Sequence, residues 1–102
     1  MARYNRYATH SVHHLSVHLV WVTKYRYHVL SGDVQLRARE LLRQICDAND
    51  VRILKGVVSR DHVHMHVSHP PNLSISDLVR KLKGRSGRKL LQEFPSLKKR
   101  YW

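Results

Sequence analysis

Residues 61–69 alternate between polar and apolar side chains, which is the period expected of a β-strand with two different faces. One face carries His62, His64, His66 and Ser68, and the other carries Val63, Met65 and Val67. The pattern predicts a strand that packs its apolar face on a core and exposes a row of histidines.

Two further segments are predicted to be strands. Residues 13–24 alternate between an apolar face and a mixed face, and the apolar positions are Leu15, Val17, Leu19 and Trp21. Residues 51–59 are rich in Val, Ile and Leu, which favour strands. The link Ser59–Asp61 is short enough to join this second strand to the histidine strand as an antiparallel hairpin.

Two segments have the period of an amphipathic helix. The first follows a turn and cap at residues 31–33 and carries apolar residues at Val34, Ala38, Leu41, Leu42 and Ile45. The second begins at Ser74, with Asp77 three residues later in a capping-box-like arrangement, and runs to about residue 83. Its basic face runs into residues 84–89, where glycines beside cations would let the backbone approach phosphates closely, and residues 88–94 are predicted to form a separate short helix.

The order strand, helix, strand, strand, helix is most of a ferredoxin-like or RRM-like α+β sandwich, an antiparallel sheet with helices on one face. Short connections place the histidine strand in the centre of the sheet, beside the first strand. We expect residues 13–102 to form one domain and residues 1–12 to be a flexible basic arm.

The charge balance points to a polyanionic partner. The chain has 102 residues, with 19 Lys and Arg against 7 Asp and Glu, so its formal net charge is +12. Residues 24–27 interleave cations with tyrosines, a pattern suited to phosphate contact and base stacking. The candidate DNA-binding residues are Lys24, Arg26, Arg80, Lys81, Lys83, Arg85 and Arg88.

The single cysteine, Cys46, lies in a helical pattern and is predicted to be a small core residue. No apolar run approaches the roughly 20 residues of a membrane span, and the polar start of the chain has no apolar signal core. We therefore expect a cytosolic protein without a membrane partner.

His62 and His64 form a candidate metal site. Residues on the same strand face lie about 6.5 to 7 Å apart, so two imidazoles can converge on one ion. The simpler interpretation of the same pattern is a solvated sheet face of polar residues. His18, on the mixed face of the first strand, is predicted to be an ordinary sheet histidine.

Four segments together resemble a known family. His18–Arg26, Val51–Leu54, Asp61–Met65 and Leu82–Ser86, in this order and spacing, are similar to the single-tyrosine HUH transposases of bacterial and archaeal insertion sequences, the TnpA type. The resemblance covers about residues 13–102, and the four segments in register make it specific.

The resemblance implies cleavage and joining of single-stranded, hairpin-bearing DNA ends through a 5′-phosphotyrosine intermediate. It implies that His62 and His64 hold a divalent cation, Mg²⁺ or Mn²⁺, that polarises the scissile phosphate. His62 and His64 are the residues carried over, whereas Lys81, Lys83 and Arg85 are candidates for contact with the DNA backbone by their position and charge. The family works as a homodimer.

The resemblance also implies a further strand and a helix that bears the catalytic tyrosine and a glutamine ligand, and this chain ends before them. Its tyrosines, none in the nucleophile's place, are Tyr4, Tyr7, Tyr25, Tyr27 and Tyr101. We therefore expect a C-terminally truncated transposase that retains DNA binding and has lost cleavage. The missing strand would leave the first strand with an unpaired edge, which favours dimerisation or aggregation.

Two alternatives stay open. The chain is a non-catalytic remnant that competes with an intact transposase, or it is a metal-dependent nuclease that uses water as nucleophile. His66 lies on the same face as His62 and His64 and is a possible third ligand. A site of three histidines would also suit Zn²⁺.

Overall fold

The structure is a computed structural model, and it describes residues 15–98 and residue 102. The predicted arm, residues 1–12, lies outside the described residues. The elements are β1 (Leu15–Val22), η1 (Lys24–Arg26), α2 (Gly32–Ala48), β2 (Arg52–Val58), β3 (His62–His69), α3 (Ile75–Glu93) and η2 (Pro95–Leu97).

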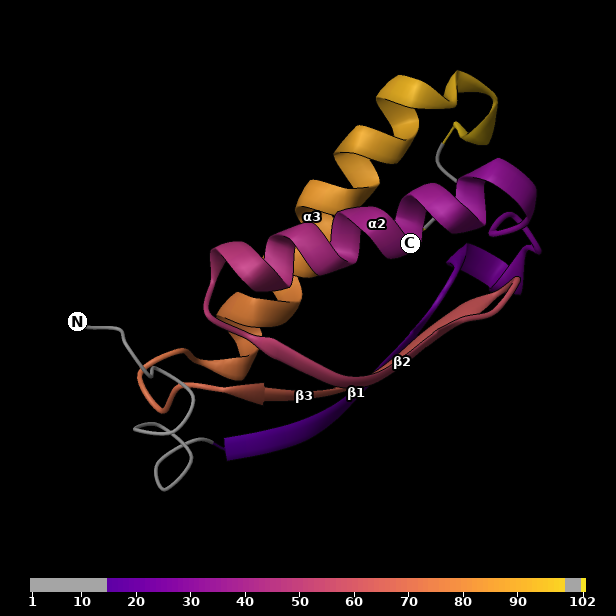
Figure 1. Cartoon of the computed structure of the whole chain (residues 1–102). Coiled ribbons are helices and arrows are strands. Elements are labelled where there is room, and N and C mark those ends of the chain that lie inside the picture. The colour runs from indigo at the N-terminus through magenta and orange to yellow at the C-terminus, as the bar shows by residue number, and fades with distance from the viewer. Residues whose placement is uncertain (1–14, 99–101) are drawn as a thin grey trace.

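The described sheet has three antiparallel strands in the order β1-β3-β2, so the histidine strand is central as predicted (Figure 1). In the pairing of β1 with β3, His18 lies opposite His66, Val20 opposite His64, and Val22 opposite His62. The expected hairpin between β2 and β3 is also present, and Ser59 N donates to the carbonyl of His62 at 2.8 Å.

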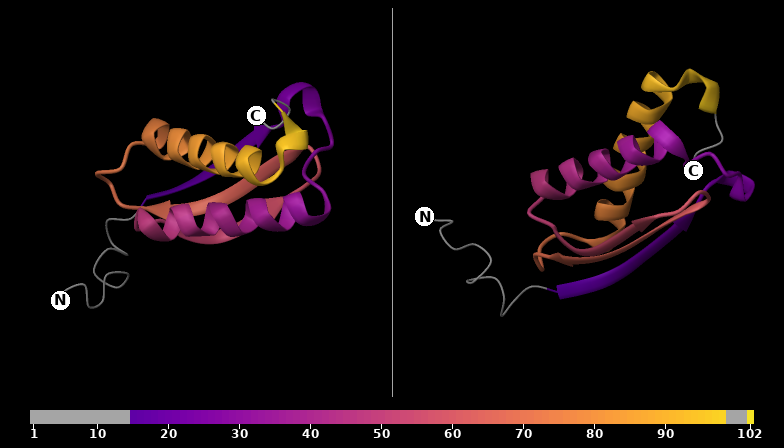
Figure 2. Two further views of the ribbon diagram at one scale, coloured as in Figure 1. Left: turned by 90° about the horizontal axis from the view of Figure 1, so that it is seen from above. Right: turned by 45° about the vertical axis from the view of Figure 1, so that its right-hand side comes forward.

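Helices α2 and α3 both lie on one side of the sheet, as the sandwich predicts (Figures 1 and 2). The core between the layers includes Leu19, Trp21, Val63, Met65 and Val67 from the sheet. It is completed by helical residues that include Ala38, Leu41, Leu42, Leu78, Leu82 and Leu90. The apolar faces of β1 and β3 are therefore turned toward the helices.

Helix α3 is continuous from Ile75 to Glu93, so the prediction of a separate short helix at residues 88–94 is wrong. The apolar stripe begun by Leu78 and Leu82 continues through Ser86, Gly87 and Leu90, which are all buried. Packing of this stripe outweighs the low helix propensity of two glycines. The glycines thus do not form a backbone cradle for phosphate.

The two helices are tied together at one end by an ion pair. Arg37 of α2 donates to both carboxylate oxygens of Glu93 of α3, from Nε at 2.7 Å and from Nη2 at 2.9 Å. The pKa of Glu93 is lowered, chiefly by the hydrogen bond from Arg37. At the start of α3, Ser74 Oγ accepts from the amide of Asp77 as predicted, whereas Ser31 makes no side-chain cap for α2.

Two side chains confirm or extend the sequence predictions about the core. Cys46 is fully buried, and burial raises the pKa of its thiol to about 12. Trp102 packs edge to face on Trp21 with 5.8 Å between ring centroids, and its Nε1 donates to the carbonyl of Lys83 at 2.9 Å.

None of the helices described is long and apolar enough to cross a bilayer.

Candidate metal and nucleic-acid site

The outer face of the sheet is the face turned away from the helices. Its members in the three strands are Ser16, His18, Val20, Val22, Arg52, Lys55, Val57, His62, His64, His66 and Ser68. The predicted histidine row is therefore confirmed as one side of β3. It stands on the central strand, where neighbours on both sides fix its backbone.

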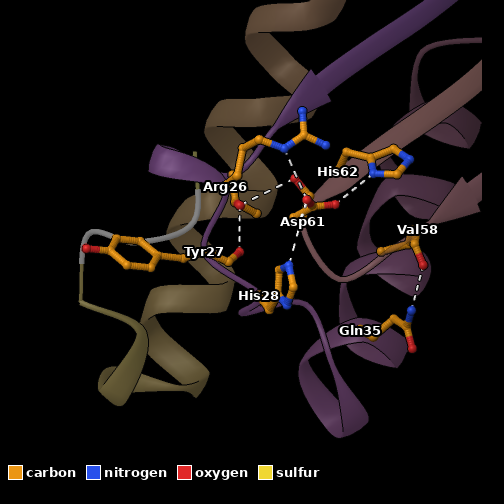
Figure 3. Close-up of polar contacts among 8 residues, drawn as sticks. Arg26, Tyr27, His28, Gln35, Val58, Asp61 and His62 are labelled. Carbon is orange, nitrogen blue, oxygen red and sulfur yellow. Dashed lines mark hydrogen bonds and ion pairs between the residues drawn. The ribbon is translucent and has the colours of Figure 1, made fainter.

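His62 lies at the first position of β3 and is oriented by the residue before it. Its Nδ1 is 2.9 Å from Asp61 Oδ1, and Asp61 Oδ2 accepts from Arg26 Nε at 3.2 Å (Figure 3). The pKa of Asp61 is lowered, chiefly by the hydrogen bond from His62 and further by the charge of Arg26, against an opposing contribution from burial.

His64 and His66 are engaged by a histidine from the neighbouring strand. His18 Nδ1 lies 3.3 Å from His64 Nε2, and the rings of His18 and His66 are stacked with their centroids 4.1 Å apart. His18 thus contacts both later members of the row. The prediction that it is an ordinary sheet histidine did not include this pairing.

The residues present fit a cation site in which the protein supplies two imidazoles. His62 has Nδ1 occupied by a carboxylate, an arrangement that prepares Nε2 to act as a ligand. Among residues 15–98 and 102, no group of three or more His, Cys, Asp or Glu is placed to share one metal ion. His66 as third ligand stays a prediction. A site with two imidazoles leaves coordination positions open on the cation, and a catalytic cation needs such positions for its substrate.

The turn after β1 reaches the His62 end of this face. Tyr25 and Arg26 are consecutive non-glycine residues in the left-handed region, with φ of 53° and 56°. Such backbone conformations persist only where the surroundings enforce them, and they cluster at functional sites. Tyr25 is 80% exposed, and Lys24 Nζ lies 5.8 Å from the centre of its ring.

The predicted DNA-binding residues divide between two surfaces. Lys24 and Arg26 lie on the turn after β1, where Arg26 pairs with Asp61 next to His62. Arg80, Lys81, Lys83, Arg85 and Arg88 lie on α3, in the helical layer. Arg85 and Arg88 are exposed and pair with no acid among the described residues. Arg80 pairs with Asp77, and Lys81 donates to Asn49 Oδ1 at 3.0 Å. The α3 cations thus form a surface separate from the histidine row.

The comparisons with known proteins agree on one family. The family described as "Transposase IS200 like" matches residues 11–102. The ISDra2 transposase TnpA of Deinococcus radiodurans is 38% identical over 91 residues, which are 89% of this chain and 65% of that protein. The transposase for insertion sequence element IS200 of Salmonella typhimurium is 36% identical over 84 residues, 82% of this chain and 55% of that protein.

A solved structure shows the same fold. A crystal structure of a candidate transposase from Deinococcus radiodurans matches with a TM-score of 0.80 and 38% identity, covering 83% of this chain and 65% of that one. The chain therefore belongs to the IS200-like transposase family. It spans between about half and two thirds of the length of the curated relatives that it matches.

Proposed function

We propose that this chain binds single-stranded, hairpin-bearing DNA, and that its outer face carries the divalent-cation site of a strand cleavage and joining reaction. The observation that carries the proposal is the pair His62 and His64 on the exposed side of the central strand, in a chain of the IS200-like transposase family. Both imidazoles project from one rigid element, so little ordering is needed to bring them to one ion.

Mg²⁺ or Mn²⁺ is the cation that we propose, rather than Zn²⁺. Bound there, it would polarise the scissile phosphate and neutralise its charge. Zn²⁺ would suit a closed set of three or four protein ligands, and the described residues bring no such group together. His62 and His64 would hold the ion, and phosphate oxygens would complete its coordination.

The two basic surfaces support DNA contact on both sides of the sheet. Lys24 and Tyr25 precede Arg26, which pairs with Asp61 next to His62, and a cation for phosphate with a ring for base stacking suits contact with a single strand. The exposed guanidiniums of Arg85 and Arg88 on α3 suit contacts with the backbone of a hairpin.

A phosphotyrosine step also needs a tyrosine hydroxyl held next to the phosphate. Tyr25 and Tyr27 lie on the turn after β1, and Tyr4, Tyr7 and Tyr101 lie outside the described residues. Tyr25 lies in the three-residue helix η1 and is 80% exposed, and Tyr27 follows this helix, so neither is carried by a strand or a longer helix that would hold its hydroxyl rigidly. We propose that none of the five is the nucleophile, so that residues 1–102 bind DNA without forming a covalent product.

Strand β1 suggests a homodimer. It pairs with β3 on one side, and no other described strand pairs with its second edge. A free edge of this kind can pair with the same strand of a second copy. A dimer mass in light scattering supports this arrangement, and a monomer mass at every concentration contradicts it.

The function is tested on end-labelled single-stranded hairpin DNA with Mg²⁺ or Mn²⁺, followed on native and denaturing gels. We expect a shifted complex on the native gel and no covalent band. Failure to shift the hairpin contradicts DNA binding. A covalent band that is removed by Tyr101→Phe contradicts the absence of a nucleophile. A metal-dependent cut without a covalent adduct identifies a nuclease that uses water, provided that the cut is lost in His62→Ala and kept in Val57→Ala.

A further inference from the structure

Asp61 uses both oxygens of its carboxylate at the entrance to the histidine strand. Oδ1 lies 2.9 Å from His62 Nδ1, and Oδ2 lies 3.2 Å from Arg26 Nε and 3.9 Å from His28 Nε2 (Figure 3). The Asp61 side chain is only 18% exposed, against 62% for Arg26 and 65% for His28. The carboxylate is therefore the enclosed centre of the group.

The backbone of Asp61 is held as firmly as its side chain. Its carbonyl accepts from the amide of Thr23 at 2.9 Å and lies 3.3 Å from Thr23 Oγ1. Thr23 is fully buried, and its hydroxyl donates to the carbonyl of Tyr27 at 2.6 Å. The end of β1 thus fixes where the Asp61 carboxylate stands.

An ionised carboxylate only accepts hydrogen bonds, so the hydrogen between Asp61 Oδ1 and His62 Nδ1 belongs to the imidazole. In a neutral ring, Nε2 then carries the lone pair. His64 lacks such a carboxylate, because its described ring contact is with another imidazole, that of His18. The two histidines of the proposed cation site are therefore prepared differently.

Arg26 completes the arrangement from a strained backbone. Its φ of 56°, next to Tyr25 at 53°, places an arginine where glycine would be easier to accommodate. In this conformation its Nε reaches Asp61 Oδ2, which is the oxygen that His62 does not use. The ion pair with Asp61 and the hydrogen bond from Arg26 N to the carbonyl of Thr23, at 2.9 Å, are the contacts that hold Arg26 in this conformation.

We propose that Asp61 is a positioning residue for His62: it holds the proton on Nδ1, directs Nε2 toward the cation, and is itself held by Arg26. This inference rests on the proposed cation site, but its first prediction concerns the ring alone. Outer-sphere carboxylates of this kind typically raise metal affinity by about 10- to 100-fold.

The test is long-range ¹H–¹⁵N NMR of the histidine rings at about pH 8 without metal, on the full chain and on Asp61→Ala and Asp61→Asn. We expect His62 of the unchanged chain to carry its proton on Nδ1, and Asp61→Ala to move most of it to Nε2 while the His64 ring keeps its pattern. Asp77→Ala is the matched control, because Asp77 also pairs with an arginine but lies at the start of α3.

Mn²⁺ titration of the same proteins then tests the consequence. Affinity that falls by about 10- to 100-fold in Asp61→Ala and stays unchanged in Asp77→Ala supports the proposal. A His62 proton on Nε2 in the unchanged chain, or an identical His62 pattern in the folded Asp61→Ala variant, overturns it. If the His62 ring shows the expected proton on Nδ1 but the unchanged chain does not bind Mn²⁺, the orienting role of Asp61 is supported and the proposed cation site is overturned.

Discussion

The two faces of β3 carry different properties of the molecule. Toward the helices, Val63, Met65 and Val67 are 0%, 3% and 0% exposed and lie in the core. On the outer face, His64 is exposed and His62 and His66 are partly exposed, and their contacts are with polar groups. One alternating segment thus supplies both stability and candidate chemistry, and single substitutions should separate the two.

The largest expected effect is on stability and comes from the inner face. Met65→Ala should lower the free energy of unfolding by about 2–5 kcal/mol, because it leaves a cavity in the core. His64→Ala, one residue away on the outer face, should change it by no more than about 0.5 kcal/mol. Urea unfolding of both variants measures the difference. Equal losses would show that the outer face is also a structural element.

The next effect concerns DNA binding by the helical layer. The double variant Lys83→Ala, Arg88→Ala should weaken binding of hairpin DNA and reduce the slope of log affinity against log salt by about 1 for each phosphate that is no longer neutralised. Its Mn²⁺ affinity should stay unchanged, because both residues lie on α3. Arg39→Ala, Arg43→Ala on α2 is the matched control of equal charge change. Identical salt slopes for the two double variants would contradict a specific role for α3.

A smaller effect should raise stability without changing the outer face. Gly84 lies in α3, is exposed, and has no atom within 4 Å of the place where a Cβ would stand. Gly84→Ala should therefore add about 0.5–1 kcal/mol to the free energy of unfolding. Thermal unfolding with Mn²⁺ titration measures both properties. A loss of stability would mean that the glycine is needed for a close approach.

The smallest effect concerns pH. Because the pKa of Glu93 is lowered in the folded chain, its pairing with Arg37 stabilises the fold above the ordinary carboxyl pKa of 4.5 and is lost as pH falls below it. The unchanged chain should thus exceed Glu93→Gln in stability near pH 6–7, and the difference should vanish in acid. Urea unfolding at both pH values tests this. A difference that persists in acid would contradict an electrostatic origin.

The sequence predicted the sheet well because its signals are local. The period-two alternation around Met65 identified both faces of β3, and the short link Ser59–Asp61 identified the hairpin. Element order and short connections then sufficed to place β3 in the centre. The prediction failed at Gly84–Lys89, because tertiary packing of Ser86 and Gly87 against the core keeps a glycine-containing segment helical.

The candidate site was predicted only in part. Periodicity could place His62 and His64 on one face, but it could not give the register that brings His18 to His64. For Asp61, the sequence alone predicts only the end of the short link before β3. Its position directly before the histidine row was the available signal, although its bond to Arg26 depends on the left-handed turn after β1. Contacts between distant segments were therefore what the sequence lacked.

Paramagnetic broadening by Mn²⁺ shows whether the outer face of β3 binds the cation. In ¹H–¹⁵N spectra of the labelled chain, substoichiometric Mn²⁺ should broaden the amides around His62 and His64 first, and His62→Ala should abolish this while Val57→Ala retains it. Broadening centred on another part of the chain, or broadening that survives in the folded His62→Ala variant, would contradict a cation site on the outer face of β3.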